Sequence, residues 1–419
     1  MIARRWVGVL VVLGAGLALL AGLVGWALRA PALPPVAPEA SIDPAVVARG
    51  ALLARAGNCM ACHTARGGAP YAGGRRIETP FGDLYAGNLT PDDETGLGRW
   101  SREAFRRALR EGIARDGRLL YPAFPYAHFT RMGDDDVDAL QAFLRTVPAV
   151  RRPDTPHALR FPYNTQAALA LWRLTQFEPG RFQADSTQSA EWNRGAYLVQ
   201  GVAHCAACHG TRNAWGATTD AFGGEALPDG RWRAPSLHDP RQAGVQDWPV
   251  ERLVALLRDG SVDGASVAGP MAEVVFHGTQ YLPEADLRAM ASYLRTLPVR
   301  LLAPPAFAAA DGGVLAAGER LYGQHCADCH GKAGEGTPGQ YPPLAGNRVV
   351  AADDPTNALQ AIVGGGFAPA TPGHPYPYGM PPFRTLLNDT EIAAVATYLR
   401  QSWGHRAGAV RAMDVQRVR

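Results

Sequence analysis

The distribution of apolar residues predicts one long apolar helix near the N-terminus, followed by a series of shorter amphipathic ones. The long run extends from Trp6 to Leu28 without a charged residue and follows Arg4 and Arg5. A helix rises about 1.5 Å per residue, so such a run could cross a bilayer core of about 30 Å. Positive charge ahead of the run favours a cytoplasmic N-terminus and export of the rest. We expect residues 1–30 to form an uncleaved signal anchor, with a cleaved signal peptide as the alternative.

Three later segments share a second pattern, in which apolar residues recur at helical spacing. Their first turns carry acidic residues and their last turns an arginine, as the helix dipole favours. Each is preceded, ahead of a cysteine pair, by a glycine-containing segment that predicts a partner helix. The paired segments are 49–53 with 136–145, 194–198 with 286–295, and 317–321 with 391–400. This repeat predicts three small helical domains built on one plan.

Segments rich in proline and small residues separate the repeats and serve as predicted linkers. They lie at 151–156, 179–189 and 304–313. The stretch 161–177 is apolar and aromatic and is expected to be a packing helix. A length of 419 residues agrees with about three domains. We place these domains at residues 31–178, 186–300 and 311–405.

The six cysteines form three pairs, and each pair is followed at once by a histidine. The pentapeptides are Cys59-Met60-Ala61-Cys62-His63, Cys205-Ala206-Ala207-Cys208-His209 and Cys326-Ala327-Asp328-Cys329-His330. Two cysteines at this spacing can form thioethers with both vinyl groups of one haem, and the histidine then reaches the iron. Three zinc sites would need further ligand pairs, and a redox dithiol does not explain the histidines. The pattern therefore predicts three covalently bound haems c.

Charge and other motifs exclude several competing functions. The net charge is only +3 and the chain has no basic tract with interleaved aromatic residues, which argues against nucleic-acid binding. The chain also lacks the glycine fingerprint of a dinucleotide-binding fold. It therefore needs a partner in order to oxidise an organic substrate.

The second axial ligand of a c-type iron, a methionine or a histidine, is expected from the loop before the last helix of each domain. Met380 stands eleven residues before Glu391, and Met271 stands fifteen residues before Asp286. We predict that Met271 and Met380 bind the second and third irons opposite the motif histidines. The alternative for both methionines is gap-filling in an apolar pocket.

The first repeat departs from this pattern because Phe124 stands at the matching position. His128 is the predicted ligand of the first iron, and Met132 or no protein ligand are the alternatives that the sequence leaves open. A bis-histidine iron would have a lower potential than its neighbours, whereas an open iron would permit small-molecule chemistry. The carbonyls of Pro235 and Pro343 are expected to accept the proximal histidine N–H in the second and third repeats. The alternative for these two prolines is an ordinary loop turn.

Further tracts around the motifs carry a family resemblance. They are Gly57 to Thr64, Glu78 to Gly82, Asn88 to Asp92, Ser189 to Gly195 and Gly269 to Val275. With the motifs, they resemble the three-haem cytochrome c subunits of membrane-bound periplasmic dehydrogenases, over about residues 45–403. That family serves alcohol, gluconate and sorbitol dehydrogenases and molybdenum-containing aldehyde and N-heterocycle dehydrogenases. Many members carry the first haem's methionine ligand where this chain has Phe124, and several are anchored at the C-terminus.

The resemblance implies a mainly α fold, with three tandem cytochrome c-like domains after an N-terminal transmembrane helix. It also implies a catalytic partner subunit of the molybdenum, quinone or flavin type. We expect a non-catalytic electron-transfer subunit of this oxidoreductase complex, which passes electrons through three haems to membrane quinone or a terminal oxidase. The expected location is the inner membrane, with one N-terminal span and the haem domains in the periplasm. The enzymatic alternative is a multihaem peroxidase or reductase with a five-coordinate first haem.

Overall fold

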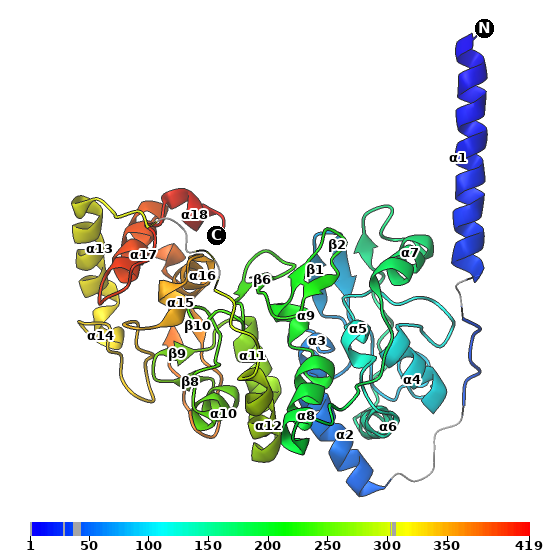
Figure 1. Cartoon of the computed structure of the whole chain (residues 1–419), viewed down its shortest axis with the longest axis horizontal. Helices are drawn as coiled ribbons and strands as arrows, with labels where there is room; N and C mark the ends of the chain where they lie inside the picture. Colours follow the sequence, from blue (N-terminus) through cyan, green and yellow to red (C-terminus); the bar gives the residue numbers. More distant parts are fainter. Residues whose placement is uncertain (1, 28–29, 37–42, 302, 304–306) are drawn as a thin grey trace. The chain divides into compact units, whose positions relative to one another are not determined.

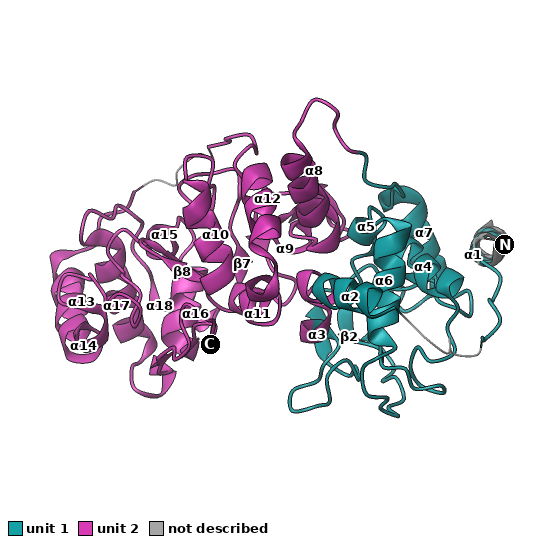
Figure 2. Ribbon diagram, turned by 90° about the horizontal axis from the view of Figure 1, so that it is seen from below, with its two compact units in different colours: residues 1–53, 62–183 teal, residues 54–61, 184–419 magenta. Residues whose placement is uncertain are grey.

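The computed structural model describes residues 2–27, 30–36, 43–301, 303 and 307–419. The chain divides into two compact units, which Figure 2 colours separately. Unit 1 comprises residues 1–53 and 62–183, and unit 2 comprises residues 54–61 and 184–419. The second and third sequence repeats therefore fold within one unit. The boundaries of the three expected domains stay a prediction.

Unit 1 is mainly helical and holds one small antiparallel sheet of order β1-β2-β3. The last residues of α2 and most of α3 belong to unit 2. The elements of this part of the chain are α1 (Ile2–Ala27), α2 (Pro44–Ala56), α3 (Cys59–Cys62), β1 (Arg76–Thr79), β2 (Gly82–Tyr85), α4 (Arg102–Glu111), α5 (Tyr126–Phe129), α6 (Asp134–Leu144), β3 (Ala158–Leu159) and α7 (Gln166–Gln176).

Unit 2 is also mainly helical, and its strands form only two-stranded antiparallel ribbons in the part of the chain that the structure describes. In the second repeat the elements are α8 (Ala190–Tyr197), the π-helical turn η1 (Leu198–Val202), α9 (Ala206–His209), β4 (Thr211–Arg212), β5 (Thr218–Asp220), β6 (Glu225–Ala226), β7 (Arg233–Ala234), α10 (Val250–Asp259), β8 (Ser261–Val262), β9 (Ala265–Ser266), α11 (Pro270–His277), the 3₁₀ turn η2 (Thr279–Tyr281) and α12 (Glu284–Leu294). In the third they are α13 (Gly312–His325), α14 (Ala327–His330), α15 (Arg348–Ala351), α16 (Thr356–Gly364), β10 (Gly366–Phe367), β11 (Gly379–Met380), the 3₁₀ turn η3 (Phe383–Thr385), α17 (Asp389–Gln401) and α18 (Ala412–Gln416).

The predicted helix pair is present in each repeat, and a glycine lies at each crossing. Figure 1 shows α8 beside α12 and α13 beside α17. A Cβ atom built on Gly195 would lie 1.8 Å from the carbonyl oxygen of Ala289, and one on Gly318 would lie 2.3 Å from that of Ala394. On Gly50 of α2 the same atom would lie 1.8 Å from the carbonyl oxygen of Ala139 on α6. Only a residue without a side chain allows the two helix backbones to approach so closely.

Polar contacts hold the first two helix pairs in a way that the third does not share. Arg49 Nε lies 2.6 Å from Asp136, and Arg194 forms a two-pronged pair with Asp286 at 2.8 and 2.9 Å. The third repeat has alanine at position 317, where the others have arginine. There, Asn388 and Glu391 form a capping box at the start of α17 instead.

The expectation of an N-terminal transmembrane helix is wrong. Within the part of the chain that the structure describes, no helix combines the length and the apolar character that a membrane crossing requires. Helix α1 begins at Ile2 and so takes in Arg4 and Arg5, and much of its remainder is glycine and alanine. The mainly helical character and the cytochrome c-like domains are present as expected.

Candidate haem-binding sites

Each Cys-x-x-Cys-His motif forms a single helical turn directly after the first helix of its repeat. In the second repeat the N–H groups of Cys208 and His209 donate to the carbonyl of Cys205, at 3.2 and 2.9 Å. In the third, Cys329 and His330 donate to Cys326 at the same two distances. The first motif lies on α3, which runs from Cys59 to Cys62. One turn brings both sulfurs and the imidazole to neighbouring positions, as attachment to one haem requires.

The three motif histidines are held by the same kind of hydrogen bond. The Nδ1 atom of His63 lies 2.8 Å from the carbonyl oxygen of Gly87. The Nδ1 atom of His209 lies 2.8 Å from that of Pro235, and the Nδ1 atom of His330 lies 3.0 Å from that of Pro342. A carbonyl can only accept, so Nδ1 carries the proton and Nε2 keeps its lone pair for a metal.

Burial keeps these imidazoles in the neutral form that binds a metal. It lowers the pKa of His63, His209 and His330 below the usual value, and the carbonyl bonds offset this only in part. The neutral form with a proton on Nδ1 is the tautomer that a haem iron needs on its proximal side. The residues present therefore fit a haem.

The carbonyl partners of the three histidines follow the sequence prediction in only one case. Pro235 accepts from His209 as predicted, whereas the partner of His330 is Pro342 and not Pro343. No partner was predicted for the first repeat, where the structure has Gly87. In the other two repeats the accepting carbonyl belongs to a proline, whereas in the first it belongs to Gly87, directly before Asn88. The sequence offered no proline at this position to point to, and the structure identifies the partner.

The cysteine thiols lie near the surface of each site, where they can reach the edge of a haem. The first cysteine of each pair is half-buried and the second is exposed, and none forms a disulfide. Burial and the neighbouring Cys208 raise the pKa of Cys205 to about 12, and burial and Cys329 raise that of Cys326 to about 11. The thiols of Cys205 and Cys326 are therefore protonated at neutral pH in the protein without haem.

The two predicted methionine ligands lie on well-defined elements. Met380 ends β11, which pairs with β10, and it packs against the core cluster that also contacts Cys326. Met271 is in the first turn of α11 and is half-buried. The ring of Trp232 packs against Gly269, two residues before Met271. The assignment of both sulfurs to iron stays a prediction.

The candidate ligands of the first iron differ in burial. Met132 is only 1% exposed and belongs to the packed interior of unit 1, whereas His128 lies on α5 and is half-buried. Phe124 packs near Phe129, with ring centroids 5.7 Å apart. The aromatic side chain therefore fills space in this loop, and a phenyl ring cannot bind iron. His128 stays the predicted ligand of the first iron.

A contact between the second and third repeats was not foreseen. The side-chain amide of Asn357, in the first turn of α16, accepts from the backbone N–H of Arg233 at 2.9 Å and donates to its carbonyl at 2.8 Å. The Asn357 side chain thereby pairs with the backbone of β7 as a neighbouring strand would. Arg233 is two residues before Pro235, whose carbonyl accepts the hydrogen bond from His209. The two partners are 124 positions apart, and no local pattern marks them.

Comparison with known proteins agrees with this geometry. The sequence profile of the cytochrome c family matches residues 47–148 and 315–403. The chain is 38% identical to the cytochrome c subunit of the quinone-type alcohol dehydrogenase of Gluconobacter oxydans, over 90% of this chain and 83% of that protein. It is 35% identical to the gluconate 2-dehydrogenase cytochrome c subunit of Pantoea cypripedii, over 90% of each. It is 41% identical to one subunit of the nicotinate dehydrogenase of Pseudomonas putida, over 95% of this chain but 34% of that protein. The chain therefore belongs to the family of cytochrome c subunits of dehydrogenases.

Proposed function

We propose that this chain carries electrons from a dehydrogenase catalytic subunit through three covalently bound haems c to membrane quinone or a terminal oxidase. The observation that carries the proposal is the threefold recurrence of one arrangement. In each repeat a one-turn Cys-x-x-Cys-His motif is followed by a carbonyl that holds the histidine Nδ1 within 3.0 Å. A chain with three such sites and no dinucleotide fingerprint is suited to electron transfer.

The residues of the chain attach, orient and shield the cofactor. Haem c, when bound, supplies a one-electron redox centre. The cysteines fix its edge, and the backbone carbonyls keep each imidazole in one tautomer and orientation, which raises the basicity of the ligand. The buried faces of the paired helices exclude water from one side of each site, which also tunes a redox potential.

The names of the relatives support a catalytic partner. Two are cytochrome c subunits of alcohol and gluconate dehydrogenases, and a third is a subunit of a nicotinate dehydrogenase. We propose a partner that carries a molybdenum, quinone or flavin centre and oxidises an organic substrate. Arg4 and Arg5 before an apolar run are typical of an export signal, which supports a periplasmic location for the haem sites.

The haem content is tested by mass spectrometry and pyridine haemochrome analysis of the matured chain. We expect three covalently attached haems, and two after the double substitution of Cys205 and Cys208 by alanine. A matched double substitution of exposed Ser186 and Gln188 by alanine should keep all three. Fewer than three haems in the unaltered chain, or an unchanged count in the cysteine variant, would contradict the proposal.

The electron-transfer role is tested by spectra and by reconstitution with the partner. We expect three low-spin haems that are reduced when substrate is added together with the catalytic subunit encoded next to this chain. Carbon monoxide binding to one reduced haem, together with peroxide turnover, would instead support the peroxidase alternative. Failure of every neighbouring dehydrogenase to reduce the chain would contradict the proposed role.

A further inference from the structure

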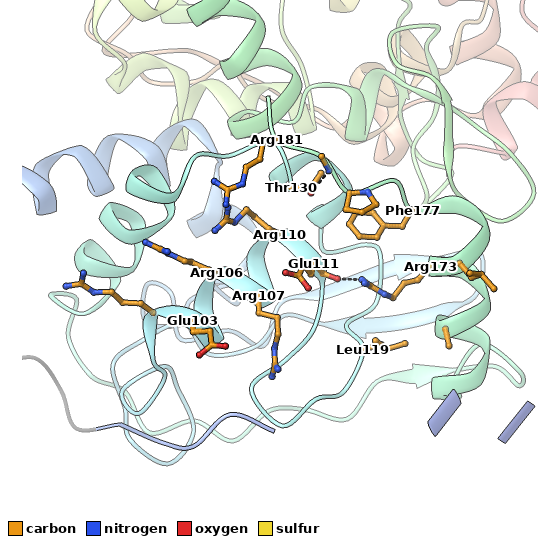
Figure 3. A pocket seen from close by; sticks show the side chains of 15 residues that line it. Glu103, Arg106, Arg107, Arg110, Glu111, Leu119, Thr130, Arg173, Phe177 and Arg181 are labelled. Carbon is orange, nitrogen blue, oxygen red and sulfur yellow. Dashed lines mark hydrogen bonds between the residues drawn. The ribbon is translucent and has the colours of Figure 1, made fainter. Parts of the chain in front are cut away.

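Unit 1 contains a cavity of about 980 Å³ that is distinct from the motif histidine and its carbonyl partner. Helix α4, helix α7 and the segment 177–181 form its walls. Figure 3 shows Arg106, Arg110 and Arg181 gathered on one side, and Arg173 and Phe177 on the other. Two glutamates and six arginines contribute to the lining, and these arginines are Arg102, Arg106, Arg107, Arg110, Arg173 and Arg181.

Three of these arginines converge on a single carboxylate. Asp134, the first residue of α6, forms ion pairs with Arg110 and with Arg181, the latter at 2.8 Å, and Arg106 lies 3.6 Å away. Arg106 also pairs with Asp138. The side chain of Arg110 is only 10% exposed. Asp134 and Asp138 supply two carboxylates against the four guanidinium groups of Arg102, Arg106, Arg110 and Arg181. Burial strengthens the field of the charge that is not neutralised. The cavity is therefore positive on this side.

Apart from Arg173, the opposite wall is apolar and continues onto the surface of α7. Leu174 lines the cavity and is 70% exposed, and Leu171, one turn earlier, is 51% exposed. Side chains three positions apart lie on the same face of a helix. The other face of α7 is fixed, because Ala170 and Leu169 pack on Ile113. The outward leucines therefore add little to the packing of unit 1.

We propose that this cavity binds the phosphate headgroup of an anionic phospholipid, and that α7 rests on a membrane surface beside it. Guanidinium groups bind phosphate oxygens through two parallel hydrogen bonds, which suits Arg181, whose side chain is 50% exposed. Exposed leucines next to clustered arginines are typical of helices that lie in the interface between lipid headgroups and acyl chains. The positive side of the cavity thus matches the phosphate headgroup of a phospholipid, and the apolar wall matches its acyl chains. This inference does not depend on the haem content of the chain.

The test uses the full haem-loaded chain and vesicles of phosphatidylcholine with or without phosphatidylglycerol. We expect tighter binding to the vesicles that contain phosphatidylglycerol. Arg181→Gln should weaken that binding about five-fold, the loss expected for one basic residue near an anionic surface. Asp134→Asn should strengthen it by a similar factor, because it removes the carboxylate that competes for the same arginines. Leu174→Ser should weaken binding without changing its dependence on salt.

The matched control is Arg320→Gln, which removes an exposed arginine from α13 in unit 2 and should change nothing. Helix α1 is the same in every sample, so differences in binding between variants do not come from it. Equal binding to both kinds of vesicle would overturn the proposal, as would equal losses in Arg181→Gln and Arg320→Gln. Full competition by inorganic phosphate would identify a free-anion site. A defect confined to assembly with the dehydrogenase subunit would identify a protein-docking site, and either result rejects the lipid.

Discussion

The helix crossing of the third repeat allows a sharp test of how its two helices are held together. In Gly318→Ala, the new Cβ atom would lie 2.3 Å from the carbonyl oxygen of Ala394 and 2.7 Å from the Cβ atom of Tyr398. Ordinary contact begins at 3.4 Å, so α13 must shift by about 1 Å from α17. Overpacking of this kind costs about 1–3 kcal/mol, and the better helix propensity of alanine recovers part of it. We expect a net loss of about 1–2 kcal/mol.

Hydrogen–deuterium exchange of the α13 and α17 peptides measures this loss locally, which a global melt of a multidomain haem protein cannot do. The expected net loss corresponds to amide exchange that is about 5- to 30-fold faster. Gly323→Ala is the matched control, because Gly323 lies on the same helix, is exposed and has no atom within 4 Å of its built Cβ. It should slow exchange through about 0.5–1 kcal/mol of added helix stability. If Gly318→Ala and Gly323→Ala changed the exchange rates of α13 and α17 equally, the close crossing of these helices would be refuted.

Three further predictions concern polar contacts. Asn357→Leu removes two hydrogen bonds to the Arg233 backbone, each worth about 0.5–1.5 kcal/mol, so amide exchange of β7 should become about 5- to 150-fold faster. Asn357→Asp keeps the acceptor and should lose about half of that free energy. Unchanged exchange in Asn357→Leu would contradict the contact. Arg194→Gln removes the pair with Asp286 and should destabilise α8 by about 0.5–1 kcal/mol, as measured by exchange at low salt, with a smaller loss at high salt. Burial opposes ionisation of Asp134, but the surrounding arginines outweigh it and hold its pKa below the usual 3.8. The ionised Asp134 therefore stabilises the folded chain fully above pH 3.8, and this stabilisation is lost as the pH falls through the lower pKa of the folded state. Asp134→Asn should flatten the acid limb of a curve of stability against pH, and an unaltered limb would show that the pair adds nothing.

Local pattern is a reliable guide wherever the chemistry is contained in a few consecutive residues. The haem motifs need only five residues, and the structure places each on one helical turn. The helices predicted at 136–145, 286–295 and 391–400 correspond to α6, α12 and α17, with their starts two residues earlier. The amphipathic period and the charged ends of a helix are written into adjacent positions, so sequence predicts them well.

Two predictions from the sequence are wrong. The N-terminal apolar run predicts a membrane span, whereas no helix in the described part of the chain has the length and apolar character of one. The carbonyl partner of His330 also differs from the prediction by one residue, since it is Pro342 and not Pro343. Two adjacent prolines offer two adjacent carbonyls, and only backbone direction decides which one faces the histidine.

The sequence by itself determined the cofactor chemistry, the repeat and the family of this protein, because these depend on short motifs and on helical periodicity. Tertiary structure alone decided which distant groups meet. Asn357 reaches Arg233 across 124 positions, and Asp134 gathers Arg106, Arg110 and Arg181 from two separate segments. Such contacts arise when helices and loops pack against one another, and neither partner carries a local signal of the other. The physical reason is that a hydrogen bond or an ion pair depends on separation in space, which the chain sets only after it has folded.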